Sequence, residues 1–248
     1  MWSHYLARFT VPVVLITALG HRFALIDTPT ALTLLALVWA AAVLALILGL
    51  SAIRAIWRLG IAGTGRAFAA IVTTIPILAI PLFYSALLLR TPALNDVTTD
   101  PSDPPLLVRA VGLREPSANS VVYPGQKAAA IQREAYPDLG PLRLGLSTPD
   151  AYEAALETAR DQGWRIVASQ PPANDGATGR IEAVAQTLLM AFSDDVAIRI
   201  APTGTGSQVD IRSASRYGQR DFGANASRIR GFLLALRERA APTAGGEK

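Results

Sequence analysis

The densest group of residues able to bind or react lies between positions 210 and 230. Guanidinium groups are planar forks that match phosphate and carboxylate oxygens. Four of the five arginines in this segment are the candidates for such a site: Arg212, Arg216, Arg220 and Arg228. Arg212 and Arg216 are four residues apart and share a face of any strand that continues this far. Arg228 is expected to begin a final helix, whose N-terminus favours anions. The pattern predicts an anion site, such as a site for a lipid headgroup.

An alternative for these arginines is pairing within the domain. A second polar set is expected to lie on neighbouring elements and to form a structural cluster with them: Glu182, Asp194, Asp195, Arg199, Asp210, Asp221 and Asn225. Residues 91–248 carry 17 basic and 18 acidic side chains, a net charge of −1. Because a site that captures anions usually carries surplus positive charge, the sequence favours internal pairing.

Catalytic groups are few in the second half of the chain. There is no cysteine, and His4 and His21 both precede residue 25, which excludes a thiol nucleophile, a Ser-His-Asp triad and a His-ligated metal there. Carboxylates such as Glu182 remain for acid–base work. The adjacent Asp194 and Asp195 point to opposite faces if a strand has begun, and at a turn they would act as caps. We expect no catalytic residue, metal or cofactor, and the sequence favours a domain that is not an enzyme.

The elements that position these residues are predicted to form an α+β domain over residues 91–240. Its antiparallel sheet has about four strands and two covering helices, with strands at residues 164–168, 180–192, 196–200 and 208–215. The first helix is capped at Thr148-Pro149, and the second carries the apolar stripe Ile229, Phe232, Leu233 and Leu236.

Alternation along the last two strands predicts how their side chains divide between the two faces of the sheet. One face receives the apolar residues Val196, Ile198, Ile200, Val209 and Ile211. The other face receives Arg199, Asp210 and Arg212, and Glu182 is expected to join them. Residues 202–207 have the composition of a hairpin turn.

The remaining parts of this half have simpler patterns. Residues 91–105 are rich in Pro, Asp and Thr and are expected to be a linker, whose Asp96, Asp100 and Asp103 serve turns and caps. A strand is expected at 106–111 and a short helix at 126–134. Residues 241–248 are predicted to be a flexible tail.

The first 90 residues are predicted to be a membrane module of three transmembrane helices, at about residues 7–26, 31–53 and 67–89. The last two contain uncharged runs of 23 residues, and a hydrocarbon core ~30 Å thick needs about 20 helical residues. Transmembrane helices tolerate internal prolines such as Pro76 and Pro81.

Charge predicts the orientation of this module in the membrane. Residues 1–90 carry six arginines against one acid, although the whole chain has a net charge of only +4. Arg54, Arg58 and Arg66 surround the loop between the second and third spans, so the positive-inside rule places this loop in the cytoplasm. His21 and Arg22 would then lie at the outer membrane interface, where they reach the headgroups unless they have a function inside the membrane. The basic charge thus indicates membrane topology and excludes a nucleic-acid partner.

Several motifs of the second half carry a family resemblance. They occur in the order LNDVTTDPSDPP (94–105), YPG (123–125), AYPDLGPL (135–142), GW (163–164), GRIEA (179–183), FSDDVAIRI (192–200) and VDIRSASRYGQRDFGANASRIRGFL (209–233). The chain resembles the family known as domain of unknown function 1499, in its membrane-anchored bacterial form with an N-terminal multi-span module. The PPANDGAT insertion (171–178) departs from the family pattern. The resemblance implies one domain and a membrane attachment, but no reaction.

Two functions follow from the sequence. The first is a bacterial inner-membrane protein with cytoplasmic first residues and a periplasmic, non-catalytic interaction domain that supports assembly or stability of an envelope or membrane-protein complex. The alternative is a domain that binds a lipid or other amphiphile at the outer face of the inner membrane. The expected partners are the bilayer, another membrane or envelope protein, and a lipid.

Overall fold

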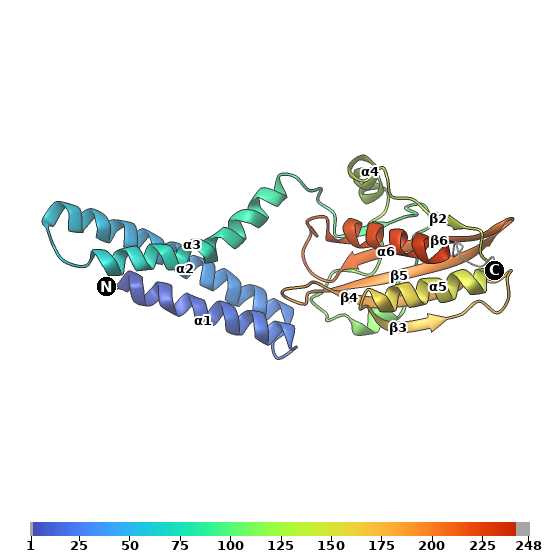
Figure 1. Ribbon diagram of the computed structural model, residues 1–248, viewed down its shortest axis with the longest axis horizontal. Helices are drawn as coiled ribbons and strands as arrows, with labels where there is room; N and C mark the ends of the chain where they lie inside the picture. Colours follow the sequence, from blue (N-terminus) through green and yellow to red (C-terminus); the bar gives the residue numbers. More distant parts are fainter. Residues whose placement is uncertain (1, 242–248) are drawn as a thin grey trace, which may run out of the picture. The chain divides into compact units, whose positions relative to one another are not determined.

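The computed structural model describes residues 2–241, and the chain divides into two compact units (Figure 1). Unit 1 comprises Met1–Arg90 together with Leu188–Phe192, and unit 2 comprises Thr91–Thr187 and Ser193–Lys248. The predicted flexible tail at 241–248 lies outside the described residues, apart from residue 241.

Unit 1 contains three helices long and apolar enough to cross a membrane: α1 (Trp2–Arg22), α2 (Thr28–Leu59) and α3 (Thr64–Leu88). The first helix ends at Arg22, before the predicted limit of 26, and Asp27 caps the next helix by accepting a hydrogen bond from the backbone N–H of Thr30 at 2.8 Å. The second helix continues past the predicted limit of 53 and ends at a left-handed Gly60.

Small side chains hold these three helices together. Ala7, Ala45 and Ala70, one from each helix, are fully buried in a shared cluster. Large apolar side chains such as Leu37 and Phe83 remain more than 60% exposed. Membrane helices pack in this way, because lipid covers the large side chains and close approach of the backbones favours association.

Unit 2 is built on an antiparallel sheet of six strands, which is larger than the four predicted. The strand order is β1-β6-β5-β4-β3, and β2 also pairs with β6. The bounds are β1 (Asp96–Thr98), β2 (Leu142–Leu144), β3 (Arg165–Gln170), β4 (Gly179–Gln186), β5 (Ser193–Thr203) and β6 (Gly206–Ser215). The two unpredicted strands, β1 and β2, have only three residues each, too few to show alternation. The first of them lies inside the predicted linker.

Two helices, α5 (Thr148–Asp161) and α6 (Ala224–Ala240), lie side by side across one face of the sheet (Figure 1). The predicted apolar set is confirmed as part of this core: Val196, Ile198, Ile200, Val209 and Ile211. The ring of Trp164 stacks on Phe232 with a centroid distance of 5.3 Å. The final helix begins at Ala224, so the prediction that Arg228 begins it was wrong.

The opposite face is covered by an irregular segment, residues 100–125, which we call the strap. It contains a single 3-10 helix, η1 (Arg109–Leu113), where the sequence predicted a strand at 106–111. Leu107 and Ala110 of the strap pack on Ala197 and Ala214 of the sheet. The strap leads into α4 (Gln126–Ala135), close to the predicted short helix.

The outer edge of β1, which has no neighbouring strand, is covered by a side chain. The Gln132 amide accepts a hydrogen bond from the backbone N–H of Thr98 at 3.0 Å and donates one to the carbonyl of the same residue at 2.6 Å. Gln132 is 2% exposed, and its amide therefore imitates one residue of a neighbouring strand.

Two hairpin turns close opposite ends of the sheet. The predicted hairpin at 202–207 is confirmed, with Thr203 paired with Gly206 around the turn Gly204-Thr205. At the other end, β4 stops at Gln186, short of the predicted limit of 192, and residues 187–192 form the turn into β5. The chain enters the sheet at this second end, where the Ser215 N–H donates to the carbonyl of Asn95 at 2.8 Å.

Candidate functional site

The charged face of the sheet centres on a buried arginine. Arg212 on β6 is 1% exposed, and its Nε and Nη2 donate to the two carboxylate oxygens of Asp96 at 2.9 and 2.7 Å. Its remaining donors reach carbonyl oxygens of the strap, at Pro105 (3.3 Å) and Val121 (2.8 Å). Burial raises the pKa of the Asp96 carboxyl, against the hydrogen bonds and the charge of Arg212, which lower it. The pair fixes β1 and both ends of the strap to the sheet.

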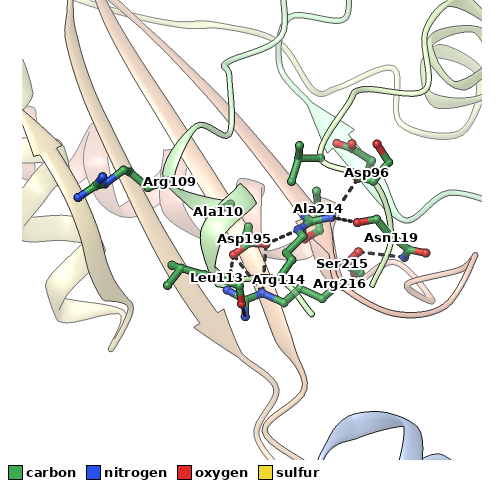
Figure 2. A network of polar contacts seen from close by, with 12 residues as sticks. Asp96, Arg109, Ala110, Leu113, Arg114, Asn119, Asp195, Ala214, Ser215 and Arg216 are labelled. Atoms are coloured by element: carbon green, nitrogen blue, oxygen red, sulfur yellow. Dashed lines mark hydrogen bonds and ion pairs between the residues drawn. The ribbon is translucent and has the colours of Figure 1, made fainter. Parts of the chain in front are cut away.

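A second buried carboxylate holds two arginines (Figure 2). Asp195 on β5 accepts from Arg114 Nε at 2.7 Å and from Arg216 Nη2 at 2.7 Å. Both guanidinium groups also donate to the strap backbone, Arg114 to Asn119 and Ser120 at 2.6 and 2.9 Å, and Arg216 to Leu113 at 2.9 Å. The strap therefore supplies one of the two arginines and several of the acceptors.

The carboxylate of Glu182 on β4 caps the 3-10 helix of the strap. It accepts the backbone N–H of Arg109 at 2.9 and 3.1 Å and that of Ala110 at 3.2 Å. The N-terminus of a helix leaves such amides without partners and favours a negative charge. The sequence placed Glu182 on the polar face but did not reveal this capping role.

Arg199 forms ion pairs with three carboxylates near the N-terminal end of the strap. Its guanidinium donates to Asp100 at 2.9 Å, to Asp103 at 2.5 Å and to Asp210 at 3.1 Å. Burial lowers the pKa of Arg199, but the hydrogen bonds and charges of Asp210 and Asp103 outweigh it, so the pKa is raised. Two of the predicted linker acids thus hold the start of the strap to β5.

A separate polar group lies on the face covered by α6. Arg228 donates to Asp194 at 2.6 Å and to the side-chain oxygen of Asn225 at 2.6 Å. Asp221 caps the helix by accepting the backbone N–H groups of Gly223 and Asn225, both at 2.9 Å. Burial raises the pKa of the Asp221 carboxyl, although these backbone hydrogen bonds lower it.

The amino-acid sequence of this domain can be compared with those of known protein families. The family described as protein of unknown function (DUF1499) matches residues 96–236, more than half of the chain. The chain belongs to this family. No curated protein and no solved structure matches it. In this DUF1499 domain, the matched segment includes the six strands, the strap and most of α6.

The predicted site residues of the DUF1499 domain fall into two groups on opposite faces of the sheet. The strap side holds Glu182, Asp195, Arg199, Asp210, Arg212 and Arg216, and the α6 side holds Asp194, Asp221, Asn225 and Arg228. Asp194 and Asp195 point to opposite faces because β5 begins at Ser193, so the idea that they cap a turn was wrong. Arg220 lies apart and donates to the carbonyl of Thr91 at 2.6 Å.

The charged side chains described above pair with one another within the DUF1499 fold. An anion would have to displace Asp96 from Arg212 or Asp195 from Arg216. Within residues 2–241, no group of three or more His, Asp or Glu side chains lies close enough to hold a metal ion. Sequence reasoning missed Asp96 and Arg114 as partners. The only signal for them was the near-neutral charge of this half, which provides about one acid for each basic side chain.

The predicted membrane-interface residues lie in unit 1. His21 is 8% exposed and contacts Thr28 Oγ1 through Nε2 at 2.9 Å, and its Nδ1 donates to the carbonyl of Met190. Arg22 donates to the carbonyl of Leu188. Three further arginines, Arg54, Arg58 and Arg66, lie in the last turns of α2 and the first turn of α3.

Proposed function

We propose that this protein is a multi-span protein of the bacterial inner membrane whose DUF1499 domain is a periplasmic, non-catalytic interaction module for another membrane or envelope protein. The observation that carries the proposal is the outer surface of the strap. Its apolar side chains are exposed by 39 to 73%: Leu106, Val108, Val111, Leu113 and Val122. Exposed apolar side chains that form a patch mark interaction sites, and these five lie within 17 residues of the chain.

The charged face supports the same proposal. The strap has little regular structure of its own, and the arginines and Glu182 of the sheet bind its backbone. These charges therefore hold an apolar segment in one conformation with its side chains facing outward. Preorganisation of this kind favours binding because less conformational entropy is lost when a partner docks.

The alternative, a lipid held inside the domain, would require an apolar cavity beneath the sheet. Bulky buried side chains fill this core instead, with Phe232 and Leu236 of α6 fully covered and Trp164 stacked beside them. Protein binding through the strap is therefore the stronger proposal.

Site-specific photo-crosslinking in native membranes tests the proposal on the full chain. A photoreactive residue at Val111 or Val122 is expected to give one discrete protein adduct, and the same residue at Glu153, on the exposed side of α5, is the matched control. The triple variant Leu106→Ser, Val111→Ser, Val122→Ser should remove an adduct formed from Leu113. Adducts that are equally strong at Glu153, or that persist in the triple variant, would contradict an interaction surface on the strap.

A second experiment tests the location. The positive-inside interpretation of Arg54, Arg58 and Arg66 predicts that alkaline phosphatase fused after residue 248 is active, because this enzyme requires the oxidising periplasm. Fusion to residue 61, in the loop between α2 and α3, is the control and should be inactive. The reverse pattern would contradict the periplasmic assignment.

A further inference from the structure

The two hairpin turns of the sheet differ sharply in chemistry. The β5–β6 turn is polar, with Gly204 and Thr205 at its tip. The β4–β5 turn, residues 187–192, reads TLLMAF, and its Leu188 and Leu189 side chains are 84% and 78% exposed. Two adjacent, almost fully exposed leucines at a tip are costly in water and indicate a surface that another apolar phase covers.

The backbone of the apolar turn is bound by the last residues of a candidate membrane helix. Leu188–Phe192 belong to unit 1, where Arg22 donates to the Leu188 carbonyl and His21 to the Met190 carbonyl. The rings of His21 and Phe192 lie 4.8 Å apart. Arginine and histidine at the end of an apolar helix lie at the level of the lipid headgroups, and the turn that they bind shares this depth.

Connectivity is consistent with this position of the apolar turn. The turn joins β4 to β5, and the β5 end that follows it pairs with Ser215, whose N–H donates to the carbonyl of Asn95, where the chain enters unit 2. Arg220 fixes the entering chain from Thr91 onward. Only Leu89 and Arg90 separate Thr91 from the end of α3, and the three Cα–Cα steps from Leu88 to Thr91 span at most about 11 Å. The connection from this candidate membrane helix to the first residues of unit 2 is therefore short.

We propose that Leu188 and Leu189 insert into the headgroup–acyl boundary of the outer leaflet and so form an additional, lipid-bound anchor of the domain. The proposal rests on the membrane location proposed above. The surface that the anchor contacts is the lipid bilayer, because Arg22 and His21, which lie at headgroup depth, donate to the carbonyls of Leu188 and Met190. Apolar side chains anchored in this way lie about 5–10 Å into the boundary region.

The absence of cysteine from the chain allows a direct test. The full-length variants Leu189→Cys and Leu188→Cys are labelled with the environment-sensitive dye NBD and reconstituted into phosphatidylcholine–phosphatidylglycerol vesicles. Thr205→Cys, at the exposed tip of the opposite hairpin, is the matched control. We expect the labels at 188 and 189 to lose most of their fluorescence to lipids that carry a nitroxide near the headgroup. Aqueous iodide should quench only the label at 205.

Any other pattern of quenching at these three positions would contradict the proposed anchor. Quenching of all three labels by iodide would place the apolar turn in water, and protection of residue 189 from both quenchers would show that protein covers it. Lipid quenching at 205 as well would show unspecific association of the dye. If lipid quenching is not seen but the phosphatase fusion is active, only the lipid anchor is rejected. If the fusion is inactive, the periplasmic location itself is rejected. The polar substitution Leu188→Ser, with the label kept at 189, should weaken lipid quenching without loss of fold, because both side chains are exposed.

Discussion

The two faces of the same sheet are covered by different means. One face is packed by α5 and α6, mainly through apolar contacts, with one polar group around Arg228 and Asp194. The other is covered by the strap, and its contacts are buried ion pairs and hydrogen bonds from side chains to the backbone. The difference follows from the covering segment. A helix satisfies its own backbone groups and leaves the sheet free to be apolar, whereas an irregular strap needs donors and acceptors from the sheet.

Loss of Arg212 is expected to have the largest effect on the strap-covered face. Arg212→Ala leaves Asp96 buried without its partner, and breaking a buried pair costs about 3–5 kcal/mol of unfolding free energy. Guanidinium denaturation followed by near-UV circular dichroism measures the loss, and trypsin cleavage at exposed Arg109 measures release of the strap. Adding Asp96→Asn should restore part of the stability. A loss no larger in Arg212→Ala than in the exposed control Arg143→Ala would show that the pair is dispensable.

The variant Glu182→Gln is expected to release the strap from the sheet without affecting the face covered by helices. In Glu182→Gln the amide turns one acceptor into a donor, which cannot bind the N–H groups of Arg109 and Ala110, at a cost of about 1–3 kcal/mol. Hydrogen exchange should become faster at these two amides and stay unchanged in α6. Glu153→Gln, on the exposed side of α5, is the control and should change neither. Faster exchange throughout the domain would mean that the strap is not a separate unit of stability.

The helix-covered face should respond to a change of volume instead of charge. Ile198 is 1% exposed in the apolar core, and Ile198→Val is expected to cost about 0.5–1.5 kcal/mol. The loss should appear in the global denaturation curve with no preferential cleavage of the strap by trypsin, and it should not depend on salt. Selective release of the strap in this variant would contradict the division between the two faces.

Tyr123 gives the smallest expected effect, on the strap side. Its ring lies 5.5 Å from the Arg212 guanidinium, and burial, followed by the charge of Asp96, raises the pKa of its hydroxyl to about 12. Between the ordinary pKa near 10 and about 12, the folded state keeps a proton that the unfolded state loses, so stability falls as the pH rises. Tyr123→Phe should remove this dependence. Absorbance at alkaline pH should show one fewer late-titrating tyrosine in the variant, and an unchanged titration would exclude the assignment.

The sequence predicted those features of the fold that depend on residues close together in the chain. Alternation predicted the division of Ile198 and Arg199 between the faces, because neighbouring strand residues always point to opposite sides. It missed β1 and β2 because three residues carry no periodicity, and it read the segment that contains β1 as a linker. The partners of Arg212 and Arg216 were harder still. Asp96 lies 116 residues from Arg212, and no local pattern specifies which acid a buried arginine selects.

The side-chain amide of Gln132 has a consequence for the behaviour of many copies of this domain. A sheet ends in strands with unpaired backbone groups, and a second molecule can extend the sheet by adding its own strand there. Since Gln132 already bonds both backbone groups of Thr98, this position offers no template for such growth. The Gln132 side chain thus prevents a second copy from pairing with the sheet at Thr98.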